Sequence, residues 1–245
     1  MREWLGKRYW VVGASEGLGL ALAQQLSRAG AEVILSARHA ETLERALLEM
    51  PGRASRVVMD VTKPESVNAA MAEVGEVDGL ICLAGANWPV FARQWDAGKA
   101  EAMCDINLTG TMRVLGAVMP SMVARGRGHI LLVGAMPSLH GQPGAAAFAA
   151  SKAGIAALAE GLASELEGSG VQIQLARPGF IRTRQSEHSP YHMPFMMEPQ
   201  AAAQQIFELM QTAHLRKSFP WRYSWATALA SRLPASVQRK LFPQR

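Results

Sequence analysis

Short apolar runs alternate with segments of helical periodicity along most of this chain of 245 residues. The first run is residues 8–12 (RYWVV), and apolar residues spaced near 3.6 follow it over residues 17–29. Further runs lie at residues 32–36, 56–59, 79–83, 129–133 and 171–176. Because nearly every residue of these runs is apolar, they are typical of parallel strands covered by helices on both faces. The sequence therefore predicts an α/β protein with a doubly wound parallel sheet.

The chain length suits one large sheet, so we expect a single domain over residues 1–220 and a tail over residues 221–245. Hydrophobic residues make up 49% of the chain and charged residues 18%, which is enough to bury a sizeable core. Around residues 184–200 the rhythm breaks into a segment rich in proline, histidine and methionine, which indicates a mobile loop or a short helical lid. Further helices are expected at residues 41–50, from Pro64, at residues 100–123 and at residues 145–167.

A glycine cluster, GASEGLG at residues 13–19, joins the first strand to the first helix. One glycine permits a tight turn, another lets the backbone approach a pyrophosphate, and a third lets helix and strand pack closely. The start of the helix then offers free N–H groups and a partial positive charge to the phosphates. The cluster therefore predicts a dinucleotide-binding turn of a Rossmann fold.

The end of the second strand indicates which dinucleotide is bound. Arg38 follows Ser36 and Ala37, and no acid lies at this strand end. An acid here usually holds the ribose 2′-hydroxyl of NAD(H), whereas an arginine fork suits the 2′-phosphate of NADP(H). The sequence thus favours NADP(H) over NAD(H), with a solvated surface cation as the alternative for Arg38. Asp60 ends the third strand, where it is expected at the adenine edge or as a helix-capping residue.

These residues and several others resemble the short-chain dehydrogenase/reductase family over about residues 8–220. The resemblance is carried, in family order, by Gly13-x-x-x-Gly17-x-Gly19, Asp60-Val61, Ala84-Gly85, Asn107, Lys152 and the PGFIRT segment at residues 178–183. Together these motifs are very specific for the family.

The resemblance implies a map of the cofactor site. It places the phosphates against Gly13, Ser15, Gly17, Leu18 and Gly19. It places adenine between Asp60 and Val61, and it adds Ala84 and Gly85 to the cofactor site. It assigns the nicotinamide ribose hydroxyls to Lys152 and the carboxamide to Pro178, Gly179, Ile181 and Thr183.

The resemblance also implies a catalytic set of asparagine, serine, tyrosine and lysine, of which this chain matches only two. Asn107 and Lys152 are retained, but Phe148 replaces the tyrosine and Ala135 replaces the serine. A positioned general acid contributes about 10²–10⁴ in rate and a donor to a developing oxyanion about 10²–10³. We therefore predict that the usual mechanism does not run here.

Two functions remain open at this point. In the first, the chain binds NADP(H) but has lost the usual catalysis, and it acts as a cofactor sensor, partner subunit or scaffold. In the second, it is an active NADPH-dependent carbonyl reductase or alcohol dehydrogenase with a rearranged proton donor, on a substrate that could be lipid-like. The candidate donors are Ser138, His140, Tyr191 and His192.

The net charge of +5 is concentrated near the C-terminal end, where residues 214–245 hold basic residues and no acid. Trp221, Tyr223 and Trp225 lie among them. Basic aromatic segments can lie on an anionic membrane, and they can also cover a neighbouring subunit or a substrate cleft. Because the rest of the chain is slightly acidic, nucleic acid is not an expected partner.

Cys82 and Cys104 lie in apolar or helical settings, so we expect reduced thiols in a reducing compartment. The first ten residues lack the apolar run of a signal peptide, and no stretch approaches the roughly 18 continuous apolar residues of a membrane span. The expected location is therefore cytoplasmic, soluble or peripheral to a membrane. No histidine pairs with a cysteine or an acid at metal-ligand spacing, and Pro190 separates His188 from His192, so no metal is expected. In the family, the helices expected at residues 100–123 and 145–167 form a subunit interface, which implies a homodimer or homotetramer.

Overall fold

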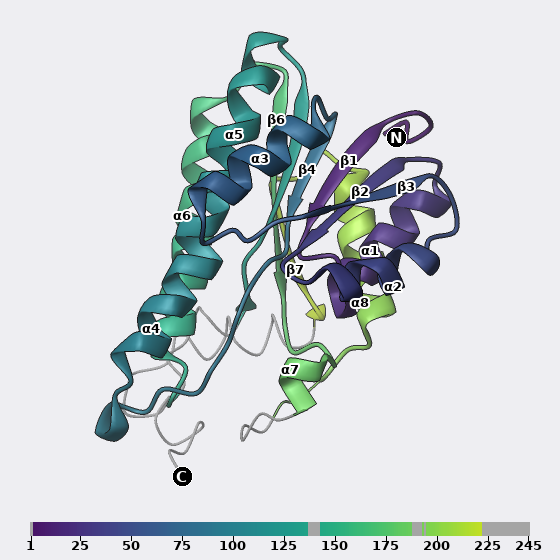
Figure 1. Ribbon diagram of the computed structural model, residues 1–245. Coiled ribbons are helices and arrows are strands. Elements are labelled where there is room, and N and C mark those ends of the chain that lie inside the picture. The colour runs from purple at the N-terminus through teal and green to yellow at the C-terminus, as the bar shows by residue number, and fades with distance from the viewer. Residues whose placement is uncertain (1, 137–142, 188–192, 194, 222–245) are drawn as a thin grey trace.

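The computed structural model describes residues 2–136, 143–187, 193 and 195–221. Within these residues seven parallel strands form one sheet, in the order β3-β2-β1-β4-β5-β6-β7 (Figure 1). The strands are β1 (Arg8–Val12), β2 (Glu32–Ala37), β3 (Ala54–Val58), β4 (Gly79–Cys82), β5 (Gly128–Val133), β6 (Val171–Pro178) and β7 (Arg216–Phe219). The predicted α/β fold with a doubly wound parallel sheet is confirmed.

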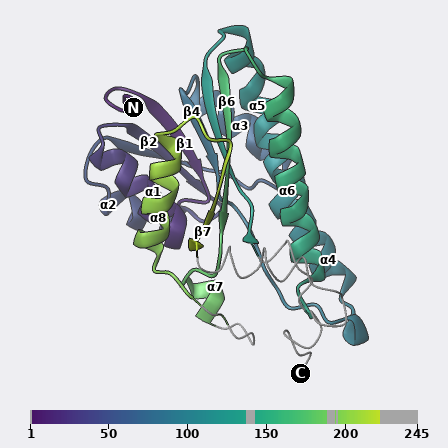
Figure 2. The ribbon, with the colours of Figure 1, turned by 180° about the vertical axis from the view of Figure 1, so that it is seen from behind.

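Helices cover both faces of the sheet (Figures 1 and 2). On one face lie α1 (Gly17–Arg28), α2 (Ala40–Leu48) and α8 (Pro199–Met210). On the other lie α3 (Pro64–Val74), α5 (Gly110–Ala124) and α6 (Ala146–Glu165). Successive strand residues point to opposite faces, so Val11 packs with the first group and Trp10 with the second. This division explains why β1, β2, β4 and β5 consist mostly of apolar residues.

The sheet reverses its order beside β1, which lies between β2 and β4. In open α/β sheets a ligand binds at such a switch point, beyond the carboxyl ends of the strands. The backbones after β1 and β4 nearly touch there, since a Cβ on Gly13 would lie 2.5 Å from the backbone nitrogen of Ala84. A Cβ on Gly19 would lie 2.0 Å from the carbonyl oxygen of Gly13. These two glycines are therefore required by the backbone packing itself.

The helix predicted at residues 100–123 is in fact three pieces. It consists of α4 (Ala97–Cys104), a π-helical turn η2 (Asp105–Thr109) and α5. Asp96 caps α4 by accepting a hydrogen bond from the backbone nitrogen of Lys99 at 3.0 Å. A π turn adds one residue to a helical turn while the chain stays helical on both sides, so the apolar spacing alone did not distinguish these pieces from one long helix.

Two elements near the end of the fold were not predicted. α8 begins with Pro199 in its first turn, and its apolar residues Ala202, Ile206 and Leu209 are buried at helical spacing. β7 has the sequence RKSF, and only Phe219 is buried. A short edge strand of mostly polar residues carries no apolar run, which is why the pattern missed it. Two short helices complete the fold, η1 (Ala92–Gln94) and α7 (Arg184–Glu187).

Contrary to the expectation that no stretch could span a membrane, α6 is long and apolar enough to do so by length and composition. In the fold α6 packs on the sheet, where Ile155 and Ala159 are buried among residues of β5 and β6. A helix that covers a sheet passes the same test, so the finding is weak evidence for a membrane span.

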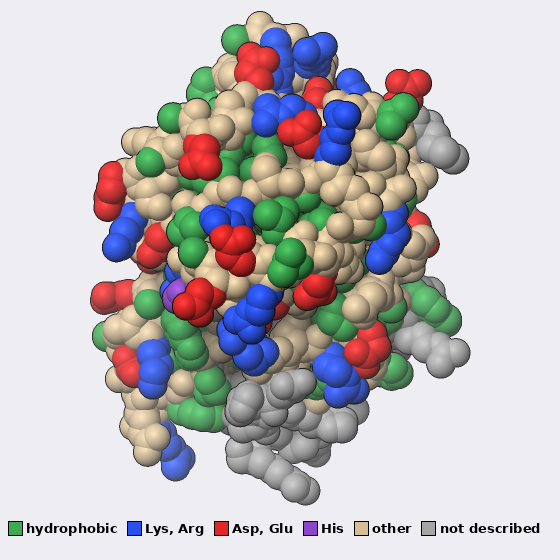
Figure 3. Space-filling model, turned by 45° about the vertical axis from the view of Figure 1, so that its right-hand side comes forward, with side chains coloured by type: hydrophobic (Ala, Val, Ile, Leu, Met, Phe, Trp, Pro, Cys, Tyr) green, Lys and Arg blue, Asp and Glu red, His purple; other side chains and the backbone are tan. Residues whose placement is uncertain are grey.

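Charged side chains of both signs are interspersed over the face shown in Figure 3.

The two cysteines are free, with Cys82 buried and Cys104 half-buried, as the sequence predicts for reduced thiols.

Candidate active site

A groove runs along the carboxyl edge of the sheet at the switch point. It consists of two cavities, which we name the glycine-loop cavity (340 Å³) and the Lys152 cavity (480 Å³). The two cavities adjoin each other, because both are lined by Leu18, Leu83, Gly85, Thr183 and Arg184. The groove is therefore extended enough for a ligand with two separate ends.

The glycine-loop cavity gathers most residues of the predicted phosphate and adenosine site. The predicted residues that line it are Gly13, Ser15, Gly17, Leu18, Gly19, Arg38, Val61, Ala84 and Gly85. α1 begins at this cavity, and the side chain of Glu16, in the capping position, makes no capping hydrogen bond. The first N–H groups of α1 thus lie beside the cavity without a side-chain cap, as an anion site requires.

Asp60 lies next to this cavity but is not one of its lining residues. Its Oδ1 accepts hydrogen bonds from the backbone nitrogen and the hydroxyl of Thr62, at 3.0 and 2.8 Å. Partial burial acts to raise the pKa of Asp60, but these bonds and the charges of Arg38 and Lys63 outweigh it, so the pKa lies below its ordinary value. In this structure Asp60 holds the turn before α3 and does not cap the helix, whose capping residue is Lys63.

The Lys152 cavity brings together the residues expected around the nicotinamide and the reacting atoms. Pro178, Gly179, Ile181 and Thr183 line it, and so do Lys152, Phe148 and Ala135. α6 places Phe148 and Lys152 one turn apart on the same face of the helix. Phe148 packs with Trp88 against a small apolar cluster that includes Met103. The wall beside Lys152 is therefore hydrocarbon at both positions where the family resemblance expects hydroxyl groups.

Lys152 is a buried cation at the base of this cavity. Its Nζ donates a hydrogen bond to the carbonyl oxygen of Val133 at 2.9 Å. Burial lowers the pKa of Lys152 to about 8, with the nearby Cys82 opposing this shift. Burial likewise raises the pKa of the Cys82 thiol to about 12, with Lys152 opposing. At neutral pH the pair is consequently an ammonium beside a neutral thiol.

Asn107, on the π turn η2, is buried and lines neither cavity. Its Oδ1 accepts a hydrogen bond from the backbone nitrogen of Ala86 at 2.7 Å, and its Nδ2 donates to Ala86 O at 3.0 Å and to Ser151 Oγ at 2.9 Å. The Ser151 hydroxyl in turn donates to the carbonyl oxygen of Phe148 at 2.8 Å. Asn107 thereby ties the loop after β4 to α6 and fixes the turn that carries Phe148.

Gly85 keeps open the space between these polar groups. A Cβ at this position would lie 3.3 Å from Asn107 Oδ1 and 3.5 Å from Lys152 Nζ. Since Gly85 lines both cavities, any side chain there would narrow the junction of the groove.

Other cavity residues were not predicted from the sequence. They come from the segments after β4 and β6 and carry no recognisable motif: Asn87, Trp88, Pro89, Arg184, Ser186 and Met193. Only the fold brings these loops together. The candidate proton donors Ser138, His140, Tyr191 and His192 lie outside the described residues, as does the tail beyond Trp221. Among the described residues, no group of histidine, cysteine and acidic side chains could hold a metal ion.

Comparison with known proteins places this fold in a family. The family model described as short chain dehydrogenase matches residues 7–192. A protein of Myxococcus xanthus named as an uncharacterized oxidoreductase is 34% identical over 232 residues, which is 91% of each chain. The solved structure of a short chain dehydrogenase/reductase family protein has a TM-score of 0.82 at 27% identity, covering 89% of this chain and 95% of that one.

A gluconate 5-dehydrogenase from Burkholderia cenocepacia, solved in complex with NADP and tartrate, has a TM-score of 0.74 at 26% identity, covering 82% of this chain and 88% of that one. The family match spans most of the chain, including the glycine turn and Lys152. The chain therefore belongs to the short-chain dehydrogenase/reductase family.

Proposed function

We propose that this chain binds NADP(H) and that the tyrosine-dependent chemistry of its family is lost or strongly weakened, so that it acts as a cofactor sensor, partner subunit or scaffold. The observation that carries the proposal is the wall of the Lys152 cavity. Phe148 and Ala135 line it beside Lys152, where a tyrosine and a serine are expected. Neither side chain has a proton or a hydrogen-bond donor to offer to a ligand oxygen.

The shape of the groove supports binding of a dinucleotide. Its two adjoining cavities offer one space to each end of such a molecule. A Cβ on Gly17 would lie 3.3 Å from Cγ2 of Thr183, so this glycine lets the start of α1 lie close to the segment after β6. The uncapped start of α1 suits the pyrophosphate. The related gluconate 5-dehydrogenase, solved with NADP, supports the same use of the fold here.

The charges around the glycine-loop cavity support NADP(H) over NAD(H). Arg38 follows β2, is exposed and lines this cavity, so its guanidinium can reach a 2′-phosphate. Asp60 and Val61 follow β3 and would lie near the adenine. The carboxylate of Asp60 is already held by Thr62, which leaves Arg38 to recognise the ribose.

At the other end of the groove the chain would orient a nicotinamide. Lys152 would bond its ribose hydroxyls, and Pro178, Gly179, Ile181 and Thr183 would hold its carboxamide. When bound, the cofactor supplies or accepts a hydride. The residues of the cavity then exclude water, but Phe148 supplies no proton and Ala135 no hydrogen bond. Because the two losses fall on one ligand oxygen, they need not add, and roughly 10²–10⁴ in rate is a fair measure of the loss.

An active NADPH-dependent carbonyl reductase or alcohol dehydrogenase is the second candidate. The observation that favours it is Lys152, which lines the cavity and has a pKa lowered to about 8. An ammonium with such a pKa can release a proton near neutral pH. Lys152 would then replace the missing tyrosine as the proton donor.

The first test is a titration of the protein with NADPH and with NADH, followed by tryptophan fluorescence. We expect micromolar binding of NADPH, weakened by Arg38→Ala, and weaker binding of NADH that the substitution leaves unchanged. If the unaltered protein binds neither nucleotide, the chain has kept the fold without the cofactor, and only a scaffold role would remain.

The second test separates the two candidate functions by carbonyl reduction with NADPH. We expect no turnover by the unaltered protein and measurable turnover after Phe148→Tyr with Ala135→Ser, because the rest of the site is in place. Turnover by the unaltered protein would favour the reductase instead, and loss of that turnover in Lys152→Met, measured at saturating NADPH, would assign the proton donor to Lys152.

A further inference from the structure

We propose that Arg184 and Glu16 form an exchangeable ion pair across the groove, and that Arg184 leaves Glu16 to bind the pyrophosphate of the dinucleotide. The inference rests on the proposed function, because it requires NADP(H) to bind in this groove. It assigns cofactor binding to Arg184. It also assigns to Glu16 a role in setting the affinity of the protein for the dinucleotide. Neither residue was among the predicted site residues.

The pair spans the junction of the two cavities. Arg184 Nη2 donates to Glu16 Oε1 at 2.9 Å, across 168 residues of sequence. Glu16 immediately precedes α1, and Arg184 is the first residue of α7. Both line the glycine-loop cavity, and Arg184 also lines the Lys152 cavity. A ligand that occupies both cavities must therefore pass beside this pair.

The turn before α7 fixes the position of Arg184. The backbone nitrogen of Thr183 donates to Ser186 Oγ at 2.8 Å, and the backbone nitrogen of Ser186 donates to Thr183 Oγ1 at 3.2 Å. Such reciprocal bonds hold the first turn of a helix rigidly. Thr183 is also the residue that a Cβ on Gly17 would meet, at 3.3 Å. The start of α7 is thus held close to the start of α1, where the phosphates are expected.

Glu16 lies at the start of a helix, where the helix dipole stabilises a negative charge. It stands in the capping position of α1, yet its carboxylate makes no capping bond and pairs with Arg184 instead. In the lining of the glycine-loop cavity its charge repels an incoming phosphate, whereas the charge of Arg184 attracts one. An arginine fork binds a phosphate at least as well as a carboxylate, so the pyrophosphate can replace Glu16 as the partner of Arg184.

The exposure of the pair allows this exchange. The side chains of Arg184 and Glu16 are 73% and 52% exposed. Ion pairs this exposed contribute little to stability. Breaking the pair between Arg184 and Glu16 therefore opposes dinucleotide binding only weakly. The contact between Arg184 and Glu16 can therefore be replaced by a contact between Arg184 and a phosphate at little cost to the stability of the fold.

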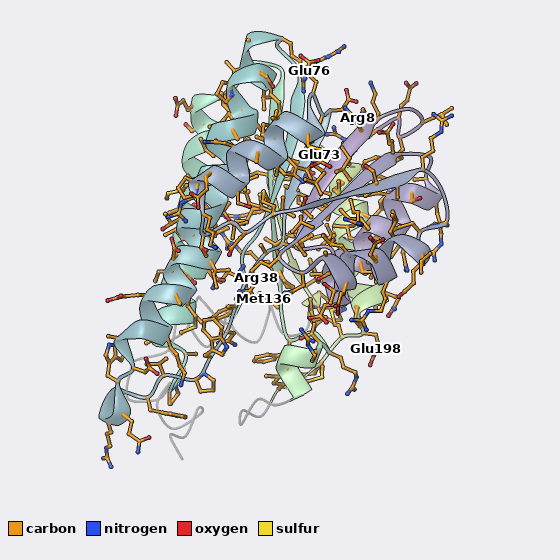
Figure 4. All side chains as sticks on the ribbon, in the orientation of Figure 1. Arg8, Arg38, Glu73, Glu76, Met136 and Glu198 are labelled. Atoms are coloured by element: carbon orange, nitrogen blue, oxygen red, sulfur yellow. The ribbon has the colours of Figure 1, made fainter. Side chains whose placement is uncertain are left out.

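A neighbouring pair provides a matched control. Arg182 Nε donates to Glu198 Oε1 at 2.7 Å, and these side chains are 55% and 59% exposed. Glu198 lines neither cavity, and Figure 4 shows it well apart from Arg38, which lines the glycine-loop cavity. Glu198→Gln thus removes an equally exposed acid from the same region without touching the groove.

The test compares NADPH and NADH binding, by calorimetric titration, in the unaltered protein and in Arg184→Gln, Glu16→Gln and Glu198→Gln. We expect Arg184→Gln to weaken both nucleotides alike, by roughly tenfold, because the pyrophosphate is common to both. We expect Glu16→Gln to strengthen the binding of both nucleotides by about threefold, because it removes a charge that repels the pyrophosphate and competes with it for Arg184. Glu198→Gln leaves both affinities unchanged, and thermal melts check that each variant is folded.

The outcomes separate this inference from the proposed function. If the unaltered protein binds NADPH and Arg184→Gln binds it equally well, the role of Arg184 is overturned while the proposed function stands. If Glu16→Gln weakens binding, the pair persists in the complex and the exchange is overturned. If the unaltered protein binds neither nucleotide, the inference and the proposed function fall together.

Discussion

At the scale of single residues, the buried ammonium group of Lys152 lowers the stability of the folded protein. It is buried, with one hydrogen bond to Val133 O, and its pKa is lowered to about 8. In the unfolded chain a lysine has a pKa near 10.4. Below pH 8 the ammonium is therefore charged in both states, and the full desolvation penalty, about 3 kcal/mol at 1.36 kcal/mol per pKa unit, acts on the folded state.

This penalty gives Lys152 a measurable pH signature. As the pH rises from 8 to about 10.4, the folded lysine loses its proton before the unfolded one, so the penalty fades and stability rises. Relative to Lys152→Met, the free energy of unfolding of the native protein should thus increase by about 2 kcal/mol between pH 7 and pH 9.5. Urea unfolding of both proteins at the two pH values measures this difference. A constant difference would show that Lys152 is not desolvated.

At the scale of elements, a buried polar chain joins β1, β5 and β6 at their amino-terminal ends. Gln174 Nε2 donates to carbonyl oxygens of Leu209, Thr212 and His214, at 2.9–3.1 Å. Its Oε1 must then accept from His129 Nε2 at 2.9 Å, which leaves His129 Nδ1 to accept from the Tyr9 hydroxyl at 3.1 Å. The network therefore requires a neutral His129.

Protonation of His129 should break this network in acid. Burial, followed by the charge of Arg2, lowers the pKa of His129 to about 3. In the unfolded chain the histidine pKa is near 6.5, so below this pH only the unfolded state gains the proton, and stability falls. Between pH 6.5 and pH 4 the loss is about 1.4 kcal/mol per pH unit.

Urea unfolding at pH 7 and pH 5 compares the native protein with His129→Gln, which cannot take up this proton. We expect a clearly smaller loss of stability in the variant. Equal losses in the two proteins would mean that other groups cause the acid sensitivity.

At the scale of the whole molecule, the layer of α5 and α6 leaves apolar surface uncovered. Met112 and Val123 of α5 are 45% and 43% exposed. On α6, only 28% of the most apolar window is buried, and Ala153 and Ala157 are exposed. Because small side chains allow close packing of helices, we propose that this layer forms the interface of a homodimer or homotetramer.

Ala157→Arg should then convert the assembly to single chains without unfolding it, since a long charged side chain would be forced into the interface. The matched control is Ala201→Arg, an exposed alanine of α8 on the opposite face of the sheet. Light scattering after size-exclusion chromatography gives the molar masses of the native protein and of both variants. A monomeric native protein, or an assembly that survives Ala157→Arg, would contradict this interface.

The sequence by itself determined the layered architecture and the outline of the groove. Every strand that is apolar on both faces was found, because burial on two sides leaves a continuous run of apolar residues. The glycine turn was found because its backbone contacts, such as that between Gly19 and Gly13, admit no side chain. The spacing of Phe148 from Lys152 likewise predicts, from the sequence alone, that Phe148 stands where the family keeps a tyrosine.

Only the tertiary structure decided which residues from distant segments meet. The apolar spacing around the π turn at Asn107 still reads as one long helix. The strand β7 is too short and too polar to show an apolar run. The binding of Asn107 to Ala86 and Ser151, and the pairing of Glu16 with Arg184, join residues that no local pattern connects. Such contacts depend on how loops after different strands are packed together. A periodic pattern records whether a residue is buried, but not which residue it contacts.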